Sequence, residues 1–411
     1  MVLLIALLSS AILGGIAYHF EVFPYQLSSA TIKGFGEMRN RVDQDARWGY
    51  ILVESDSGKT GTRVINTSGA QPGINLITKM GSDQSLEVIL INNDGLMLNQ
   101  WELNWFDIWP DADHLPAHIK PQSKPGTFIH GAVLLPNGDL IFNYEYCGML
   151  RVDKNGGVVW KLPYSTHHSL ELDEHGFLWT CGLLYLENAD AGAECELIEK
   201  QVIVKLDLDG NILNEWHVED LLIASNLRSY LYLVNRKCDY PQDLHLNDVD
   251  PIPDSLTGEF FQSGDILFSL RNVNSVFVFN TISGQVRKAV TGSFIGQHDP
   301  DAIDDGLISV FDNRNGSATK TNSRIILVET GDSVSTYYDG NEADFFSEKL
   351  GNHQWLGKGH LLIAESQMGR AFELDNEREV VWEYINRLSD GRRGFIIDVH
   401  RYPKGYAKAF E

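Results

Sequence analysis

The chain has 411 residues and a formal net charge of −23, from 33 Lys and Arg against 56 Asp and Glu. That length is sufficient to bury a large hydrophobic core. The acidic balance argues against nucleic-acid binding, which favours basic faces, and an anionic substrate would have to be held by local positive groups.

The chain opens with an almost wholly apolar segment, residues 2–17. This segment is short for a full membrane span, but its length suits the apolar region of a signal peptide or signal anchor. Lys33, Arg39 and Arg41 follow it, and by the positive-inside tendency they favour a cytoplasmic side for the rest of the chain. The charges therefore leave the orientation open. We predict that residues 1–20 form a signal peptide or a signal anchor.

Residues 21–85 are predicted to form a linker and a small β appendage. From Trp48 to about Thr78 the chain is rich in strand-forming residues and in turn signals. The stretch is too short for a sandwich domain of ordinary size. We therefore expect the main domain to begin at about Leu86.

Two sequence phrases alternate along the rest of the chain. The first opens on a histidine, turns at a glycine eight residues later and returns as an apolar strand, as in the copies that begin at His130, His168 and His298. Looser copies begin at His245, His353 and His400. The second phrase is a short strand, a turn and a second strand that often ends in tryptophan: Trp101, Trp160, Trp216 and Trp382.

A repeat of roughly 40–50 residues built from two hairpins is the signature of a β-propeller blade. Five complete sets of four strands begin at His130, His168, His245, His298 and His353. One hairpin at Glu87–Leu103 and one strand pair at Val399–Phe410 are left over, and together they make a sixth blade that closes the ring. We predict an all-β fold, a six-bladed β-propeller over residues 86–411 whose sixth blade is shared by both chain ends, plus the small N-terminal β appendage.

Because the first strand of a propeller blade is innermost, histidines at the same end of these strands would surround one mouth of the central channel. A recurring histidine is often structural, since it can cap a strand or bond to the neighbouring blade, and we assign this role to His130, His353 and His400. The others have polar neighbours that a spacer would not need: His168 in THHS, His245 in DLHLNDVD and His298 in QHDPD.

These segments resemble the motifs of the bacterial arylsulfotransferases, in the order HHSLELDEHGFLW, DLHLNDVD followed by SLRN, and QHDPDAIDDGLISVFDN. The likeness spans about Thr127 to Phe410. It implies a six-bladed propeller enzyme that moves a sulfuryl group from a phenolic sulfate ester to another phenol without a nucleotide donor or other cofactor. It also implies an exported protein, periplasmic or membrane-anchored through residues 2–17, and leaves a homo-oligomer open. The family's N-terminal β-sandwich is larger than the segment here, and the acidic insert around Asn188–Glu199 is unfamiliar.

By motif, the resemblance implies that His298 accepts the sulfuryl group and that His168 and His245 support it. Arg271, in SLRN, would bind the sulfuryl oxygens, and His167 is the neighbour that could be confused with His168. The residue types suit this chemistry. A neutral imidazole is a nucleophile near pH 7, further histidines can exchange protons with the phenol oxygens, and a forked guanidinium can hold two oxygens at once.

Other interpretations of single residues stay open. Arg271 could form a salt bridge between blades, and Asp299 could orient an imidazole or cap a strand. Asn247 and Asn313 are expected to satisfy turn backbone. Cys147, Cys181, Cys195 and Cys238 show no zinc spacing and are read as buried thiols, with one Cys195–Cys238 disulfide as the alternative in an oxidising compartment.

Two other function classes compete with the sulfotransferase. One is a metal-dependent propeller lyase or hydrolase in which the histidines ligate a divalent ion, although Arg271 in the same cluster would repel a dication. The other is a non-catalytic ligand-binding propeller. The phosphate-binding pattern GxxxxGK[ST] is absent from the sequence, so a nucleotide donor is not expected.

Overall fold

The computed structural model describes residues 52–53, 63–66, 69–82, 85–117, 119–187, 197–234, 236–237, 240–241, 244–314, 322–329, 333–343 and 345–411. The predicted signal segment, most of the linker, and both Cys195 and Cys238 lie outside these ranges. Cys147 and Cys181 are buried thiols, as predicted. Within the described ranges no helix is both long and apolar enough to cross a membrane.

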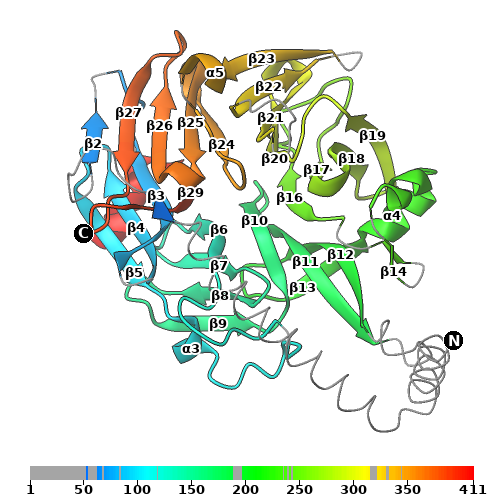
Figure 1. The fold of residues 1–411 in the computed structure, drawn as a ribbon, viewed down its shortest axis with the longest axis horizontal. Coiled ribbons are helices and arrows are strands. Elements are labelled where there is room, and N and C mark those ends of the chain that lie inside the picture. The colour runs from blue at the N-terminus through cyan, green and yellow to red at the C-terminus, as the bar shows by residue number, and fades with distance from the viewer. Residues whose placement is uncertain are drawn as a thin grey trace, which may run out of the picture. The chain divides into compact units, whose positions relative to one another are not determined.

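The described strands form six antiparallel blades of a β-propeller, as predicted (Figure 1). Blade one consists of β6 (Ile129–Leu134), β7 (Leu140–Tyr144), β8 (Gly148–Val152) and β9 (Val158–Leu162). Blade two consists of β10 (Thr166–Leu172), β11 (Leu178–Glu187), β12 (Leu197–Leu206) and β13 (Ile212–His217). Blade three consists of β16 (Leu246–Pro251), β17 (Asp265–Leu270), β18 (Ser275–Asn280) and β19 (Gln285–Thr291).

Blade four consists of β20 (His298–Ile303), β21 (Leu307–Asp312), β22 (Arg324–Val328) and β23 (Val334–Asp339). Blade five consists of β24 (His353–Leu356), β25 (His360–Glu365), β26 (Arg370–Leu374) and β27 (Val380–Ile385). The strand β2 (Arg63–Asn66), which the sequence places in the appendage, pairs with β27 and extends blade five at its outer edge.

The sixth blade is shared by the two ends of the chain, as predicted, but the division differs from the expected one. It consists of β29 (Ile396–Tyr402), β3 (Ile74–Met80), β4 (Leu86–Asn92) and β5 (Met97–Glu102), so one strand comes from the C-terminal end and three from the N-terminal end. The expected second C-terminal strand is instead the 3-10 helix η9 (Lys404–Phe410). The N-terminal part of the sixth blade therefore begins at Ile74 and not at Leu86, because the buried, apolar β3 fills the place beside β29.

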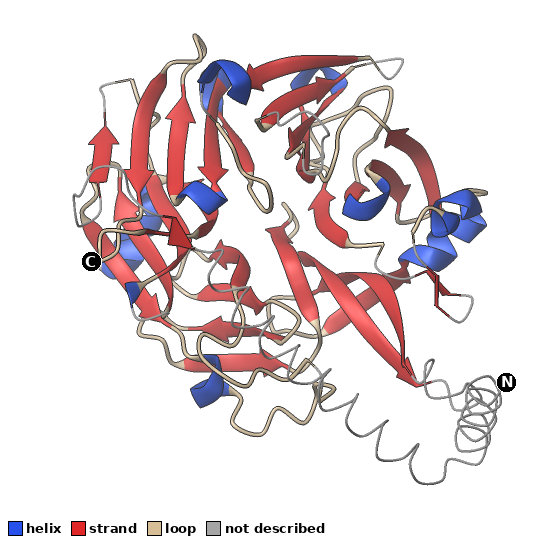
Figure 2. Ribbon diagram, in the orientation of Figure 1, coloured by secondary structure: helices blue, strands red, loops and turns tan. Residues whose placement is uncertain are grey.

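Short helices and small strands complete the chain, and strands dominate each blade (Figure 2). The helices are α3 (Trp105–Ile108), α4 (Val218–Ala224), α5 (Gly340–Ala343), η3 (Arg228–Tyr232), η4 (Arg271–Val273), η5 (Asp304–Gly306), η7 (Gly357–Gly359) and η8 (Ser366–Met368). The two-residue strands are β1 (Leu52–Val53), β14 (Arg236–Lys237), β15 (Tyr240–Pro241) and β28 (Arg393–Gly394).

The hydrophobic core lies between the blades. Each cluster of buried apolar side chains in the described residues joins two neighbouring blades, as Phe268 of blade three and Trp179 of blade two do. Both faces of each sheet are buried, and each large buried side chain contributes about 1.5–3 kcal/mol.

Tryptophans at the ends of outer strands also connect adjacent blades. The Trp101 indole N–H donates to the Asp153 carbonyl at 3.0 Å, that of Trp160 to Leu208 at 3.0 Å and that of Trp382 to Asn93 at 2.9 Å. These contacts explain why the second sequence phrase ends in tryptophan.

Four inner strands are irregular at or beside their histidines. Register shifts in the pairing of β6, β10, β16 and β20 with their partners mark a β-bulge there, and β29 has a shift at Ile396–Asp398, ahead of His400. Bulges redirect side chains and are common beside functional sites. In blade one the bulge requires glycine: Gly131 has φ of 74°, and a Cβ there would lie 2.4 Å from the His168 carbonyl oxygen.

Candidate functional site

His298 opens the inner strand β20 and is 4% exposed, with its backbone position fixed by the bulge that follows it. Its Nδ1 lies 2.7 Å from Asn313 Oδ1 and 3.2 Å from the Gly296 carbonyl oxygen. The Asn313 amide nitrogen donates to the carbonyls of Ser347 at 2.8 Å and Leu350 at 2.7 Å, so its oxygen must face His298. His298 Nδ1 therefore carries the proton, and Nε2 of the neutral ring holds a lone pair.

The electrostatics keep His298 neutral. Burial and the positive charge of Arg271 lower the pKa of His298 to about 3, against the weaker opposing effect of the Asn313 hydrogen bond. A histidine with that pKa is an unprotonated base at neutral pH. The geometry thus gives His298 the tautomer and the charge state of a nucleophile.

The structure distinguishes the two histidines of the THHS doublet. His168, 3% exposed, packs its ring against His245 and His130, with centroid distances of 5.0 and 4.6 Å. His167 is fully buried behind it, where its Nδ1 lies 2.8 Å from His168 Nδ1 and its ring stacks on Tyr146. Burial and the neighbouring histidines lower the pKa of His168 well below its usual value. His168 is thus the member of the doublet that joins the group of histidines.

His245 and Arg271 come together on the inner hairpin of blade three. The Arg271 backbone N–H donates to the His245 carbonyl at 2.9 Å, where β17 passes into η4. The Arg271 Nη1 donates to Asn272 Oδ1 at 2.9 Å, and its charge acts on His298. All four residues to which the sequence gives catalytic roles therefore lie in one neighbourhood, although their roles stay predictions.

Three residues of this neighbourhood have left-handed backbone conformations that are uncommon outside glycine. The φ angles are 54° at His168, 60° at His245 and 51° at Asp299. Each such residue costs of order 1–3 kcal/mol, and such residues cluster where a site must hold side chains in fixed directions.

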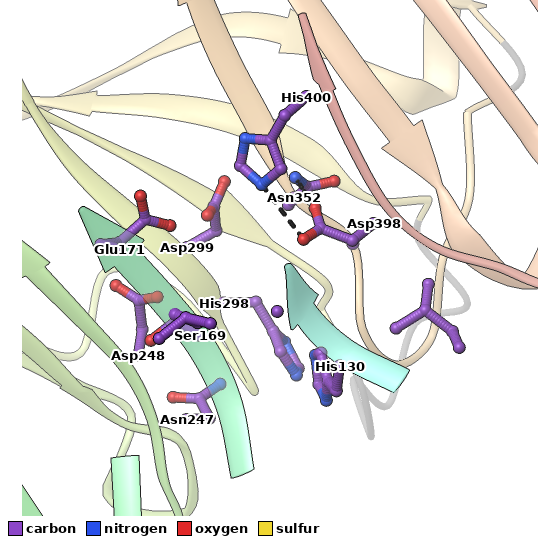
Figure 3. Close-up of a pocket in the computed structure, with 14 residues that line it drawn as sticks. His130, Ser169, Glu171, Asn247, Asp248, His298, Asp299, Asn352, Asp398 and His400 are labelled. Carbon is purple, nitrogen blue, oxygen red and sulfur yellow. Dashed lines mark hydrogen bonds and ion pairs between the residues drawn. The ribbon is translucent and has the colours of Figure 1, made fainter. Parts of the chain in front are cut away.

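His298 and His130 line a cavity (Figure 3) whose walls come from the inner strands β6, β10, β16, β20 and β29. His130 lies on β6, and its Nδ1 is 2.8 Å from Glu145 Oε2. The other half of the cavity is acidic and is lined by Glu171, Asp248, Asp299 and Asp398. The cavity therefore has His298 and His130 on one side and a group of carboxylates around His400 on the other.

Two histidines with predicted structural roles are held by these carboxylates. Asp299 Oδ2 accepts hydrogen bonds from the backbone N–H and from Nδ1 of His353, the latter at 2.7 Å, so Asp299 both caps β24 and orients an imidazole. His400 Nε2 lies 3.1 Å from Asp398 Oδ2. Burial opposes protonation of His400, but Asp398, Glu171 and Asp299 together raise its pKa to about 10.

Because buried carboxylates line the cavity, we predict that the stability of the fold depends on pH. Burial, assisted by Asp398 and Asp299 and opposed by His400, raises the pKa of Glu171 to about 7. Between pH 4.5, near the pKa of Glu171 in the unfolded chain, and about pH 7, the folded protein binds more protons at Glu171 than the unfolded chain does. The contribution of Glu171 to the free energy of unfolding is therefore present at low pH and is lost as pH rises. We expect Glu171→Gln to raise the melting temperature, relative to wild type, more at pH 8 than at pH 5.

Scanning calorimetry at the two pH values measures this difference. Glu174→Gln, at an exposed position after the same strand, is the control and should give a difference that does not change with pH. A Glu171→Gln difference that stays constant or shrinks as pH rises would contradict the prediction.

Two groups of side chains place donor atoms within 4.8 Å of one another, as a metal site would: His130, Glu145 and His168, and Asp299, Asp301 and His353. In the second group both ring nitrogens of His353 have partners, Asp299 at 2.7 Å and Ser309 Oγ at 2.8 Å. In the first, His130 Nδ1 is engaged by Glu145 and His168 Nδ1 by His167. In each group one of these hydrogen-bond partners is a carboxylate of the group itself, Glu145 or Asp299.

Sequence reasoning missed Glu145 and assigned Asn313 to turn backbone alone. Asn313 does satisfy backbone carbonyls, but it also fixes the tautomer of His298. The signal was present in the sequence: Glu145 stands 15 residues after His130, and Asn313 stands 15 after His298. Both lie in the turn that leads from the second to the third strand of a blade.

Comparison with known proteins identifies one matching family. The model of the arylsulfotransferase family, "Arylsulfotransferase (ASST)", matches residues 131–387, from blade one to the end of blade five. No curated protein matches the chain.

Among solved structures, a protein of unknown function from Bacteroides caccae is 14% identical with a TM-score of 0.47, over 80% of this chain and 99% of that one. A virginiamycin B lyase from Staphylococcus aureus is 10% identical with a TM-score of 0.39, over 84% and 89% of the two chains. A streptogramin B lyase is 12% identical with a TM-score of 0.42, over 83% and 98%.

Proposed function

Since the chain belongs to the arylsulfotransferase family, we propose that it moves a sulfuryl group from a phenolic sulfate ester to an acceptor phenol through a sulfohistidine at His298. The observation that carries this proposal is the Asn313–His298 hydrogen bond. It leaves the lone pair on Nε2 of a ring that lines the cavity. No nucleotide donor takes part in the proposed reaction.

In the first half-reaction His298 Nε2 attacks the sulfur of the donor ester. The nitrogen–sulfur bond forms as the bond between sulfur and the phenol oxygen breaks, and the phenol leaves with a proton from the enzyme. In the second half-reaction the acceptor phenol loses its proton to the enzyme and attacks the same sulfur. His298 is then released as a neutral imidazole.

The other predicted residues support these two displacements. The guanidinium of Arg271 is fixed in charge, so it can bind the sulfuryl oxygens while it keeps His298 unprotonated. In this proposal His168 and His245, whose rings are in contact, hydrogen-bond the phenol oxygens as these enter and leave. Against the net charge of −23, the Arg271 guanidinium supplies the local positive potential that an anionic donor needs.

The test is colour release from p-nitrophenyl sulfate, measured with and without an added phenol. We expect little release from donor alone beyond one equivalent per enzyme, and continuous release once an acceptor is present. Continuous release without acceptor would identify a sulfatase and contradict the proposal. No release from any aryl sulfate would leave the ligand-binding propeller as the better description.

The same assay separates the proposal from a metal-dependent propeller enzyme. Activity should survive exhaustive dialysis against a chelator. Loss of activity together with a stoichiometric metal ion, and its return when the metal is restored, would overturn the sulfotransferase proposal.

A further inference from the structure

Two blades of the propeller hold a cavity-lining histidine in the same way but with chemically different partners. In blade four His298 Nδ1 is 2.7 Å from the Asn313 amide oxygen, and in blade one His130 Nδ1 is 2.8 Å from the Glu145 carboxylate. The partner stands 15 residues after the histidine in both cases, in the turn between the second and third strands. At the same position of the repeat, one imidazole is therefore hydrogen-bonded to an amide and the other to a carboxylate.

The difference between amide and carboxylate decides what each imidazole can do. The Asn313 amide is neutral, so it fixes the tautomer of His298 without favouring a second proton. An ionised carboxylate also accepts the Nδ1 proton, but its negative charge stabilises the imidazolium, as in other carboxylate–histidine pairs. An imidazole with a carboxylate partner can exchange a proton at Nε2 while Nδ1 stays bonded to that partner.

The Glu145 carboxylate is held in place and kept ionised. The Glu145 backbone N–H donates to the Phe128 carbonyl at 3.0 Å, and the Thr127 hydroxyl donates to the Glu145 backbone carbonyl at 2.9 Å. Only 16% of its side-chain surface is exposed. Burial raises the pKa of the Glu145 carboxyl, but the charge and hydrogen bond of His130, with smaller effects from His167 and His245, outweigh it and hold the pKa below its usual value.

His130 lines the same cavity as His298 (Figure 3). Its ring also lies 4.6 Å, centroid to centroid, from the ring of His168. Glu145 Oε1 is also 4.0 Å from His168 Nδ1, so the carboxylate faces both rings. His168 is buried among other histidines, which disfavours a second proton on its ring, whereas His130 has a negative partner.

Resting on the proposed function, we propose that the His130–Glu145 pair is the acid and base of sulfuryl transfer. As the bond between sulfur and the donor oxygen breaks, Nε2–H of the His130 imidazolium gives its proton to that oxygen, and neutral His130 remains bonded to Glu145. As the acceptor oxygen attacks the sulfohistidine, its proton passes to His130 Nε2 and restores the imidazolium. His298 ends each cycle neutral, so protons and charge balance.

The experiment compares donors whose leaving groups differ in their need for a proton. p-Nitrophenolate leaves readily without protonation, whereas the phenolate of unsubstituted phenyl sulfate is a much stronger base and leaves slowly unless it is protonated. We expect Glu145→Gln, which keeps size and hydrogen bonding but removes the charge, to slow sulfuryl-enzyme formation from phenyl sulfate by about 100-fold or more. Formation from p-nitrophenyl sulfate should slow by less than about fivefold.

His130→Gln is the second variant and should show the same selective loss if Glu145→Gln does not fold. Asp254→Asn is the matched control, because it removes the carboxylate from the solvent-exposed His175–Asp254 pair at 3.1 Å, outside the cavity. It should leave both rates unchanged.

The outcomes separate this proposal from the one on which it rests. If wild type forms no sulfuryl-enzyme from either donor, the proposed function fails. If wild type forms it and the two variants slow both donors equally, or neither, the proton-transfer role is overturned while the function stands.

Discussion

His298→Asn is expected to reduce sulfuryl transfer to background, a loss of at least about 10³-fold in kcat, as removal of a nucleophile does in other covalent enzymes. Asparagine keeps a polar side chain but has no nucleophilic nitrogen, so the sulfohistidine cannot form. The lost hydrogen bond to Asn313 is worth about 1 kcal/mol, so the melting temperature should change by only a few degrees.

Intact-mass measurement after brief exposure to donor alone, at mildly alkaline pH, checks this result. Wild type should gain one sulfuryl group and His298→Asn none. His175→Asn, at an exposed histidine, is the control and should behave as wild type. An adduct that persists in His298→Asn would move the nucleophile to another histidine of the group, and an unchanged transfer rate would end the arylsulfotransferase interpretation of this site.

Asn313→Asp is expected to give His298 the kind of partner that His130 has, and so to suppress the nucleophile at mildly acidic pH. In wild type the pKa of His298 is lowered to about 3, mainly by burial and Arg271. A carboxylate 2.7 Å from Nδ1 would stabilise the imidazolium and raise that pKa. A rise of about 1–3 units would bring that pKa to between about 4 and 6. At the upper end of this range, the neutral fraction at pH 5 would fall about tenfold.

The pH profile distinguishes this effect from structural damage. Rates of Asn313→Asp should rise with pH as His298 loses its added proton, whereas wild type should show no such rise from His298 above about pH 5. Asn313→Ala is the control: it also loses the amide donors to Ser347 and Leu350, but it adds no charge. If the aspartate and alanine variants share one pH profile, the tautomer argument for His298 is wrong.

The candidate site was only partly predictable from the sequence, for a physical reason. His168, His245, Arg271 and His298 stand out because each lies in a distinctive polar segment at the start of an inner strand or hairpin. Glu145 has no such context: it follows a run of buried residues and has the appearance of an ordinary turn residue. What it does depends on which atom it faces, and His130 Nδ1 is its neighbour only after two strands have paired.

The division of the sixth blade shows the same limit. The repeat spacing determines six blades and a closure between the two chain ends, because hairpin strands pair with sequence neighbours and their period is visible in the sequence. Which segment lies beside β29 is a matter of long-range pairing, and Ile74–Met80 carries no histidine phrase that would mark it. Its apolar residues fit the place between β29 and β4, and that fit exists only in the folded ring.

The sequence by itself thus determined the fold class, the number of blades and the residue types that could carry sulfuryl chemistry. Those follow from period, turn glycines and motif order, which are local properties. The tertiary structure decided which ring of the THHS doublet joins the other histidines. It also decided that His298 is hydrogen-bonded to an amide and His130 to a carboxylate, and that carboxylates and histidines line one cavity. These depend on bulges and on contacts between blades, where a difference of one residue in register changes the direction in which a side chain points.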